Sequence, residues 1–441
     1  MLTRSVRLLI LSCACLPLAG QTAMAAGYAI KEQSATAQGN AFAGATAGAE
    51  DISYMFFNPA GLTRHRGIQA QGVASYIMPT SDPKNASGTD ALGANALAGS
   101  GGDDAAIDAL VASFYGSGQI NDWIFVGFGV NAPFGLKTTY DEGWIGRYHG
   151  VTSSLTTLNI NPNVAFKVTD WLSLGVGFQA QYADARLTQA IDTGTLAGLP
   201  DGGTAVQDSF GDVRGDDWGF GYTLGVLVEP MDGTQIGVGF RSKIEHTLDG
   251  DARFTLSPAG QGVSAMTGAF QRTGAKADLT TPASLSAGIY QQLTDQIAVM
   301  GEFAWTDWSE FNELRIQFNN PAQSDSVTTE NWDDAYFAAI GATYMPDDAW
   351  TLRAGVAYDQ SPVPSSTRTP RIPDGDRYWI SVGASYQPME WLALSAGYTH
   401  IFVQDTSVRL SGAGENLLRG SLDVDYENSI DIIVLSGRIS F

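Results

Sequence analysis

The stretch of sequence that decides the fold is residues 27–62, GYAIKEQSATAQGNAFAGATAGAEDISYMFFNPAGL. Glycine and alanine are dense in this stretch, and apolar and polar residues do not alternate for long, so it lacks the pattern of a β-strand. Small side chains suit a segment that packs closely inside a larger structure. We therefore predict that the rest of the chain forms a wall around it.

A secretory targeting segment precedes this stretch, at residues 1–25. Arg4 and Arg7 supply a positive start, residues 8–18 are a short apolar core, and an Ala-Met-Ala cleavage site ends at Ala25. An N-terminal membrane anchor is the alternative, but the apolar run is too short to span a bilayer. We predict that the chain is cut after Ala25.

Both cysteines of the chain, Cys13 and Cys15, lie in the targeting segment. A lipoprotein signal at Cys13 is an alternative, but Leu11 stands where such signals prefer a small residue. The processed chain would contain no cysteine, which excludes disulfide bonds and thiolate chemistry. The 46 acidic residues outnumber the 24 basic ones, and this balance argues against nucleic acid as a partner.

Segments with the period of a β-strand fill the rest of the chain. Apolar residues alternate with small or polar ones in residues 171–182, WLSLGVGFQAQY, and residues 235–241 and 378–386 repeat the pattern. This alternation gives a strand one apolar face and one small or polar face. No later segment offers about eighteen consecutive apolar residues, so no membrane-spanning helix is expected.

The connections between these segments alternate between short and long. A soluble β-sandwich would show the same strands, but short turns on one side and long loops on the other are typical of an outer-membrane barrel. Seven long and six short connections predict fourteen strands, with both chain ends on the short-turn side. The short turns lie at 118–122, 168–170, 229–233, 293–296, 346–349 and 387–390. The long connections lie at 79–106, 138–150, 188–215, 249–276, 319–331, 361–375 and 410–424.

Aromatic residues support a membrane barrel. Four tryptophans directly follow short turns, where an amphipathic ring would lie at the membrane interface; these are Trp123, Trp171, Trp350 and Trp391. Four unrelated core tryptophans are the alternative. The chain also ends in IIVLSGRISF, an alternating strand that closes on the aromatic Phe441, as outer-membrane barrels commonly do. We predict an all-β membrane protein, a fourteen-stranded antiparallel transmembrane barrel over residues 68–441.

The lumen of such a barrel needs a plug. Eight strands enclose a space that side chains fill, whereas sixteen to eighteen leave a water channel. Fourteen strands should therefore enclose a lumen wide enough to leak. Residues 26–67 are the spare segment with suitable composition, and we predict that they form an N-terminal hatch inside the lumen.

Several motifs are spread over the chain. The first group is Tyr28, Glu32-Gln33-Ser34, Gly39-Asn40-Ala41, Gly44 and Asn58-Pro59-Ala60. Later motifs are Trp218-Gly219-Phe220-Gly221, Trp308-Ser309 with Phe311, Ser361-Pro362-Val363-Pro364, Arg368, Ile372-Pro373-Asp374 and Asp376-Arg377-Tyr378-Trp379. With these motifs, residues 26–441 resemble the FadL/TodX family of outer-membrane transporters for long-chain fatty acids and other hydrophobic compounds. The resemblance implies a fourteen-stranded barrel with an N-terminal hatch.

The Asn-Pro-Ala motif ends the small-residue stretch. Proline removes a backbone donor and fixes φ, and an asparagine side chain can bond the backbone nearby. A plain turn is the alternative. The resemblance implies a role in holding the hatch to the wall, and the residues that we assign to holding and gating the hatch are Gly27, Tyr28, Asn58, Pro59 and Ala60.

A second motif interrupts the third predicted strand. Proline inside a strand breaks the ladder of hydrogen bonds, and a neighbouring glycine permits a bend. A simple bulge is the alternative. The resemblance implies a kink that opens a lateral passage from the lumen to the bilayer. The residues assigned to this kink are Asn131, Pro133, Phe134 and Gly135, which flank Ala132.

The carboxylate of a fatty acid needs a cation. The candidates on predicted strands or at their ends are Lys137, Arg147, Arg186, Arg241 and Lys243. The alternative for each is a solvated charge at the rim or in the lumen.

This chain also departs from the family pattern. Two basic positions that are associated with carboxylate binding in the family align with Gln189 and Thr328, and Arg186 lies near the first. Either another cation takes over or the substrate lacks a carboxylate. The ligand-binding residues that we predict are Phe56, Phe57, Arg186, Gln189 and Thr328.

Catalysis is not expected, and neither a metal nor a cofactor is predicted. The histidines, His65, His149, His246 and His400, show no metal-ligand spacing and no nucleophile motif. An outer-membrane hydrolase with a Ser–His pair made by the fold is the alternative.

The sequence therefore predicts facilitated uptake of hydrophobic molecules across the outer membrane of a Gram-negative bacterium. Long-chain fatty acids are the leading substrates, and aromatic hydrocarbons are the alternative. A hydrophilic general porin is a further alternative, although its lumen would need no such hatch. The expected partners are the hydrophobic ligand and outer-membrane lipid, and the chain is expected to act as a monomer.

Overall fold

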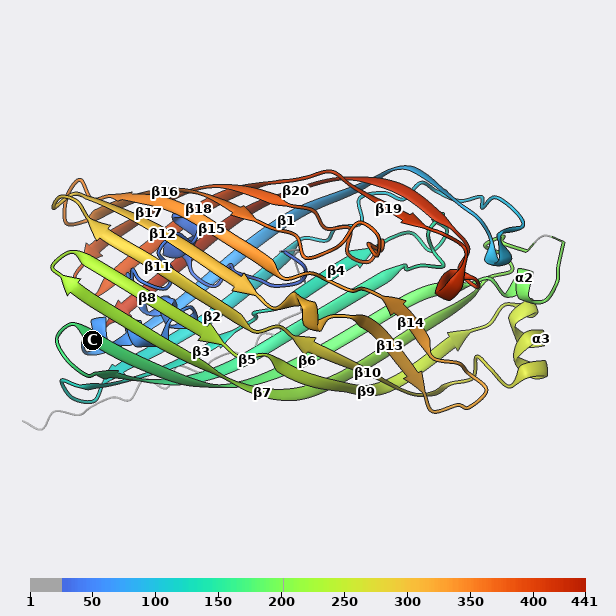
Figure 1. Ribbon diagram of the computed structural model, residues 1–441, viewed down its shortest axis with the longest axis horizontal. Coiled ribbons are helices and arrows are strands. Elements are labelled where there is room, and N and C mark those ends of the chain that lie inside the picture. Colours follow the sequence, from blue (N-terminus) through green and yellow to red (C-terminus); the bar gives the residue numbers. More distant parts are fainter. Residues whose placement is uncertain (1–25, 201) are drawn as a thin grey trace, which may run out of the picture.

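The computed structural model describes residues 26–200 and 202–441, so the predicted targeting segment lies outside the described residues. A closed antiparallel barrel of fourteen passes surrounds a lumen (Figure 1). The uninterrupted passes are β1 (Ile68–Gly88), β2 (Ala109–Gln119), β5 (Thr152–Lys167), β6 (Leu172–Ile191), β7 (Ser209–Met231), β16 (Trp350–Asp359), β17 (Arg377–Met389) and β20 (Leu422–Ser440).

Each of the other passes is divided into two strand segments. They are β3 (Ile124–Asn131) with β4 (Gly135–Thr139), β8 (Thr234–Arg241) with β9 (Ile244–Thr255), β10 (Thr273–Thr281) with β11 (Ser284–Gln292), β12 (Ile297–Thr306) with β13 (Glu313–Phe318), β14 (Ser326–Thr329) with β15 (Ala335–Tyr344), and β18 (Leu392–Val403) with β19 (Thr406–Leu410). The prediction of fourteen antiparallel strands is confirmed.

The first and last passes close the barrel. β1 pairs with β20 in antiparallel register from Gln69↔Ser440 to Gly88↔Leu422. The backbone nitrogen of Phe441 also donates to the oxygen of Ile68 at 2.8 Å. Both ends of the wall therefore lie at the short-turn end, as predicted.

The polarity of the wall is opposite to that of a soluble protein. On β6, Leu174, Val176 and Phe178 are exposed on the outer surface, whereas Gln179 and Gln181 are fully buried inside. The four tryptophans that follow short turns are also exposed. Apolar side chains facing outward and polar ones facing inward are what a barrel in a bilayer requires. No helix among the described residues is long and apolar enough to cross a membrane.

Several strands run further than predicted at the long-loop end. We predicted connections at 79–106 and 188–215, but β1 continues to Gly88, β6 ends at Ile191 and β7 begins at Ser209. The predicted loop boundaries were wrong because the apolar alternation stops where the wall leaves the bilayer, while the ladder of backbone hydrogen bonds continues. Four helices of the described residues are found at this end, namely η3 (Ala91–Gly93), α2 (Thr193–Leu196), α3 (Pro258–Thr267) and η5 (Gly414–Asn416).

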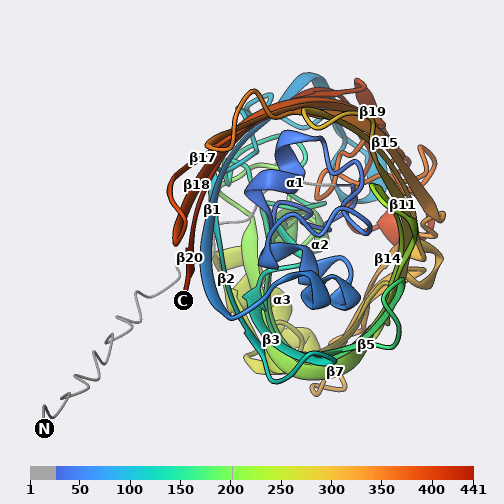
Figure 2. The same ribbon diagram turned by 90° about the vertical axis from the view of Figure 1, so that its left-hand side faces the viewer.

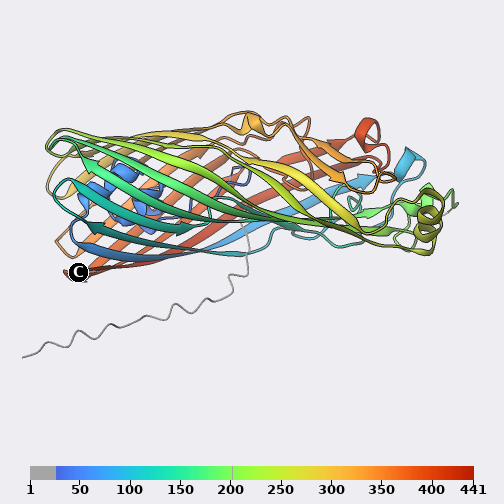
Figure 3. The same ribbon diagram turned by 90° about the horizontal axis from the view of Figure 1, so that it is seen from below.

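The N-terminal segment, residues 26–67, lies inside the barrel (Figure 2). It fills the part of the lumen nearer the short turns, and the wall extends well beyond it toward the long loops (Figure 3). Its short helices are α1 (Ala35–Gly39), η1 (Ile52–Phe56) and η2 (Pro59–Arg64). Ser34 caps α1, since its side chain accepts a bond from the Ala37 nitrogen at 3.2 Å.

Glycines of the wall allow this segment to pack closely against it. A Cβ added to Gly355 would lie 2.1 Å from the Asn40 oxygen, and one added to Gly225 would lie 2.1 Å from Asn58 Oδ1. Any larger residue at either position would have to displace the segment. The close fit therefore depends on small residues in the wall as well as in the segment that it encloses.

Candidate functional site

Asn58 connects three parts of the molecule. Its Nδ2 donates to the oxygens of Thr46 at 2.7 Å and Val226 at 2.9 Å, and its Oδ1 accepts from the Ala60 nitrogen at 3.0 Å. Pro59 is the first residue of η2, where a missing backbone N–H costs nothing. The motif thus caps a helix of the N-terminal segment and bonds that segment to β7.

The third pass is broken at residues 132–134. β3 ends at Asn131 and β4 begins at Gly135, and the β2–β3 ladder ends at the pair Phe114↔Val130. Among the described residues, no strand ladder joins β2 to β4 above this pair. The hydrogen-bonded wall is therefore open beside the first residues of β4, up to the bridge between Ala106 and Thr138.

The beginning of the N-terminal segment binds the backbone of this break. The Gly135 nitrogen donates to the Tyr28 oxygen, and the Ile30 nitrogen donates to the Pro133 oxygen, each at 2.8 Å. Ala29 and Phe134 are the paired residues of this short antiparallel bridge. A movement of residues 28–30 would consequently remove the hydrogen bonds that hold the break.

An apolar cavity of about 810 Å³ lies beyond this bridge, toward the long loops, and we call it the inner cavity. Leu155, Leu248 and Ile316 are among its lining residues, and Tyr28 lies in its wall. Polar residues line it as well, and the two that bear on ligand binding are Arg371 and Glu330. Its mostly apolar lining suits a hydrophobic molecule with one polar group.

Arg371 is buried and has no ion-pair partner among residues 26–200 and 202–441. It donates to Ser153 Oγ at 2.8 Å and to Gln189 Oε1 at 3.0 Å. Burial, and then the neighbouring Arg419, lower the pKa of Arg371 to about 10. The guanidinium therefore remains charged at neutral pH, and its positive charge is not compensated.

Glu330 does not supply that compensation at neutral pH. Burial raises the pKa of its carboxyl to about 8, and the hydrogen bond from Trp332 only partly opposes this. Trp332 Nε1 donates to Glu330 Oε2 at 2.9 Å. Most of the Glu330 carboxyl is therefore neutral at pH 7, and the inner cavity keeps the positive charge of Arg371.

A wider depression of about 1650 Å³, the outer groove, adjoins the inner cavity at the long-loop end. Arg371 lines both spaces, and Arg419 lines the outer groove. Arg419 donates to Thr328 Oγ1 at 3.3 Å and to Ser326 Oγ at 3.0 Å. Gln189 and Thr328, the two positions predicted to lack the family's cation, thus each contact an arginine from a long loop.

Sequence reasoning missed Arg371 and Arg419. Both lie in long loops, where no periodicity indicates which side chains point inward. Arg371 directly precedes the Ile-Pro-Asp motif, within the most specific stretch of the resemblance, and that proximity was the available signal.

The structure does not bring Arg186 to either space. Its side chain faces outward from β6 and forms an ion pair with Asp212 at 2.9 Å. Lys243 is similarly exposed and pairs with Glu310 at 3.2 Å and Glu245 at 3.4 Å. Lys137, on β4, lines neither the inner cavity nor the outer groove. The assignment of Arg186 to the ligand is corrected accordingly, because its place on the strand directs it away from the lumen.

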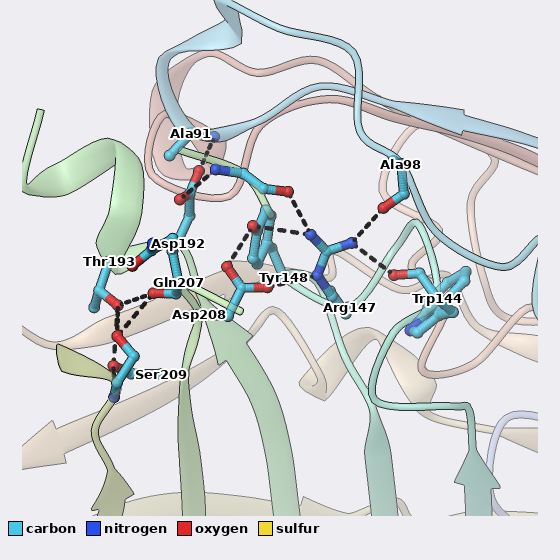
Figure 4. A network of polar contacts seen from close by, with 12 residues as sticks. Ala91, Ala98, Trp144, Arg147, Tyr148, Asp192, Thr193, Gln207, Asp208 and Ser209 are labelled. Carbon is cyan, nitrogen blue, oxygen red and sulfur yellow. Dashed lines mark hydrogen bonds and ion pairs between the residues drawn. The ribbon is translucent and has the colours of Figure 1, made fainter. Parts of the chain in front are cut away.

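Arg147 is fully buried in a polar network between loops (Figure 4). Its Nε donates to Asp208 Oδ2 at 2.7 Å, and its Nη2 donates to the Gly203 oxygen at 2.7 Å and to the Tyr148 hydroxyl at 3.1 Å. Because an acid and a carbonyl already bind it, this guanidinium joins loops and is not available to a ligand.

A second cavity of about 680 Å³, the break cavity, lies against Pro133 and Phe134. Phe56 and Phe57 line it, and their ring centroids are 5.0 Å apart. Arg241 lines it as well. The predicted ligand residues are therefore divided, with Phe56 and Phe57 at the break and Gln189 and Thr328 near the long loops.

Residues 28–31 separate the two cavities, since Tyr28 lines the inner one and Ala29, Ile30 and Lys31 line the break cavity. The Tyr28 ring packs edge-on against Trp308 at 4.6 Å between centroids. Gly27 adopts φ +63°, and its nitrogen donates to Asp374 Oδ2 at 2.9 Å. The first residues of the N-terminal segment are thus held by one aromatic cluster and one buried carboxylate.

The described residues contain no group of three or more His, Cys, Asp or Glu side chains that could hold a metal ion. The histidines are separate from one another. His149 contacts the Gly420 oxygen at 3.2 Å, and His246 contacts Gln181 at 3.2 Å.

A family model described as outer membrane protein transport protein (OMPP1/FadL/TodX) matches residues 16–441. The chain belongs to the OMPP1/FadL/TodX family. It is 30% identical over 414 residues to the long-chain fatty acid transport protein of Escherichia coli (strain K12), a match that covers 88% of this chain and 90% of the relative.

Solved structures of this family share the fold. A crystal structure of a Pseudomonas aeruginosa FadL homologue superposes with a TM-score of 0.87 at 26% identity and covers 94% of this chain and 100% of that one. The Ralstonia pickettii toluene transporter TbuX superposes with a TM-score of 0.65 at 20% identity, over 93% of this chain and 99% of that one.

The chain is thus a FadL/TodX-family barrel of the Gram-negative outer membrane that transports hydrophobic compounds. The predicted family, fold and location are confirmed.

Proposed function

We propose that this FadL/TodX-family barrel takes up long-chain fatty acids and holds their carboxylate at Arg371. The observation that supports this is an uncompensated, buried guanidinium at the junction between the outer groove and the apolar inner cavity. A buried charge without a counterion is costly, and an anionic head on an apolar chain would remove that cost while filling the cavity.

The proposed route leads from the outer groove to the inner cavity and then sideways through the wall. A ligand that occupies the inner cavity competes with Tyr28 for space. Displacing Tyr28 would remove the Tyr28–Gly135 and Ile30–Pro133 hydrogen bonds and so release the break in the third pass. The apolar chain would then leave between β2 and β4 into the outer-membrane lipid. No cofactor is required, because the ligand moves down its gradient.

Two further assignments complete the proposal. Asn58, Pro59 and Ala60 keep the rest of residues 26–67 in place as a hatch while residues 28–30 move. All parts of the route lie in one chain, so we propose that a monomer is sufficient.

Replacement of Arg371 tests the carboxylate site. We expect Arg371→Gln to weaken palmitate binding to the purified barrel by roughly 10- to 100-fold, since a hydrogen bond to a charged group contributes about 1.5–3 kcal/mol. Hexadecanol, which has no carboxylate, should bind both proteins equally well. Isothermal titration in detergent measures both ligands.

Arg186→Gln is the matched control, because it removes an arginine from the outer face. Equal palmitate affinity of the Arg371 variant and this control would contradict the assignment. Tight binding of toluene together with no binding of palmitate would favour aromatic hydrocarbons as substrates.

Palmitate binding should also weaken as the pH rises from 7 to 9. The Glu330 carboxyl, with a pKa of about 8, is mostly neutral at pH 7 and mostly ionised at pH 9, while Arg371 keeps its charge over most of this range. The ligand carboxyl is ionised throughout, because an ordinary carboxyl has a pKa near 4. A new negative charge in the cavity would therefore oppose the ligand.

The dissociation constant, measured against pH in wild type and in Glu330→Gln, checks this expectation. The wild-type curve should rise severalfold across the window, and the variant curve should rise distinctly less. Two parallel curves would exclude Glu330 as the titrating group.

A further inference from the structure

Two cations face the break cavity, and neither is bound by a carboxylate. Lys31 Nζ lies 4.3 Å from the centroid of the Phe337 ring. The Arg241 guanidinium lies 4.2 Å over the Phe56 ring and donates to the Phe56 oxygen at 3.0 Å. In the part of the chain that the structure describes, no Asp or Glu oxygen lies within 4.0 Å of a side-chain nitrogen of either residue.

The carboxyl group that lines this cavity is already engaged. Glu302 accepts hydrogen bonds from the Thr46 nitrogen at 3.2 Å and from Thr46 Oγ1 at 2.8 Å. Both of its oxygens therefore hold the N-terminal segment. Glu302 acts on Lys31 only from more than 4.0 Å away, so both cations of the cavity lack a directly paired carboxylate.

The remaining lining of the break cavity suits an alkyl chain. Phe42, Phe57, Pro133 and Phe134 contribute apolar surface to it, and ligand sites are lined mostly by such side chains. Phe134 and Pro133 belong to the break in the wall. A molecule in this cavity would therefore lie at the lateral opening, with its polar end within reach of Lys31.

We propose that Lys31, assisted by Arg241, is a second carboxylate site, which receives the head group after it leaves Arg371 and holds it while the alkyl chain passes the break. This inference rests on the proposed function and assigns to Lys31 a role in moving the ligand from Arg371 to the break. A carboxylate that left Arg371 for an apolar space without a partner would lose most of its stabilisation. A cation at the break cavity would lower the free-energy barrier to this transfer, and it would do so for charged ligands only.

Uptake by cells that carry Lys31→Met tests the proposal. At equal surface abundance, we expect palmitate uptake to fall about tenfold. This factor corresponds to the lower end of the free energy that a hydrogen bond to a charged group contributes. Hexadecanol uptake should stay at the wild-type level, and palmitate affinity of the purified protein at Arg371 should be unchanged. Lys31→Arg, which keeps the charge, should restore most palmitate uptake. Lys31→Gln gives the same comparison if the methionine variant assembles poorly.

Lys243→Met is the matched control, because it removes a lysine that faces away from the break cavity. Palmitate uptake by Lys31→Met equal to that of this control would overturn the proposal. An equal loss of palmitate and hexadecanol uptake would also overturn it, because the lysine would then serve the shape of the hatch. Failure of the proposed function itself would be recognised separately, as an absence of palmitate uptake by wild type.

Discussion

A disulfide between Ala29→Cys and Phe134→Cys should reduce palmitate uptake to the level of a deletion strain, and a reducing agent should restore it. These two residues are paired in the bridge between the N-terminal segment and the strand break. The flanking bonds at 2.8 Å, from Gly135 to Tyr28 and from Ile30 to Pro133, identify them as a non-hydrogen-bonded pair. The Cα atoms of such a pair are about 4.5 Å apart, a spacing that a disulfide accepts.

The reason for so large an effect is that the crosslink would prevent the movement on which the proposed lateral release depends. The described part of the chain contains no native cysteine to interfere. Each single cysteine variant controls for the loss of Ala29 or Phe134, and uptake before and after reduction is compared on the same cells. If the oxidised double variant transports as well as the reduced one, the ligand leaves by another route, and a path through the hatch to the periplasm becomes the better explanation.

Replacing Gly225 by valine should turn a nearly silent barrel into a conducting one. A Cβ at this position would lie 2.1 Å from Asn58 Oδ1 and 2.8 Å from Pro59 Cδ. Because Asn58 connects η2 to β7, the new side chain would detach the hatch from the wall. Water and ions would then cross a lumen of fourteen strands, which is wide once it is empty.

Single-channel recording in planar bilayers measures this expected gain. Gly72→Val is the control, since a Cβ there would meet only the Phe114 ring at 3.7 Å, an ordinary contact. Large, steady conductance in wild type would contradict the hatch and favour a general porin. Silent channels in a correctly assembled Gly225→Val barrel would show that the hatch is held by other contacts.

The wall could be predicted because its sequence pattern reflects the bilayer. Leu174, Val176 and Phe178 alternate with small or polar residues since one face of the strand contacts lipid. This alternation indicated the strands, and the short and long connections indicated their number. The same rule would have placed Arg186 correctly. It has the same parity as these exposed residues on β6 and therefore faces outward, whereas Gln189 has the opposite parity and faces inward.

The site was less predictable because its parts meet without periodicity. Arg371 comes from a loop between β16 and β17, and the Ala29–Phe134 bridge joins residues far apart in the sequence. Such contacts follow from how the lumen is filled, and no local pattern records them. The break in the third pass was visible as Pro133, but its bonding to residues 28–30 was not.

The length of β6 and β7 affects how far from the bilayer the barrel could first bind its ligand. A strand of 20 residues such as β6 is roughly 65 Å long at about 3.3 Å per residue. An outer-membrane barrel needs an apolar band only about 25 Å tall, even with its strands inclined by about 40°. At β6, about half the height of the wall therefore extends beyond this apolar band. On the proposed route, a hydrophobic molecule would therefore bind beyond the polysaccharide coat, be shielded during its passage, and return to lipid only after that coat has been bypassed.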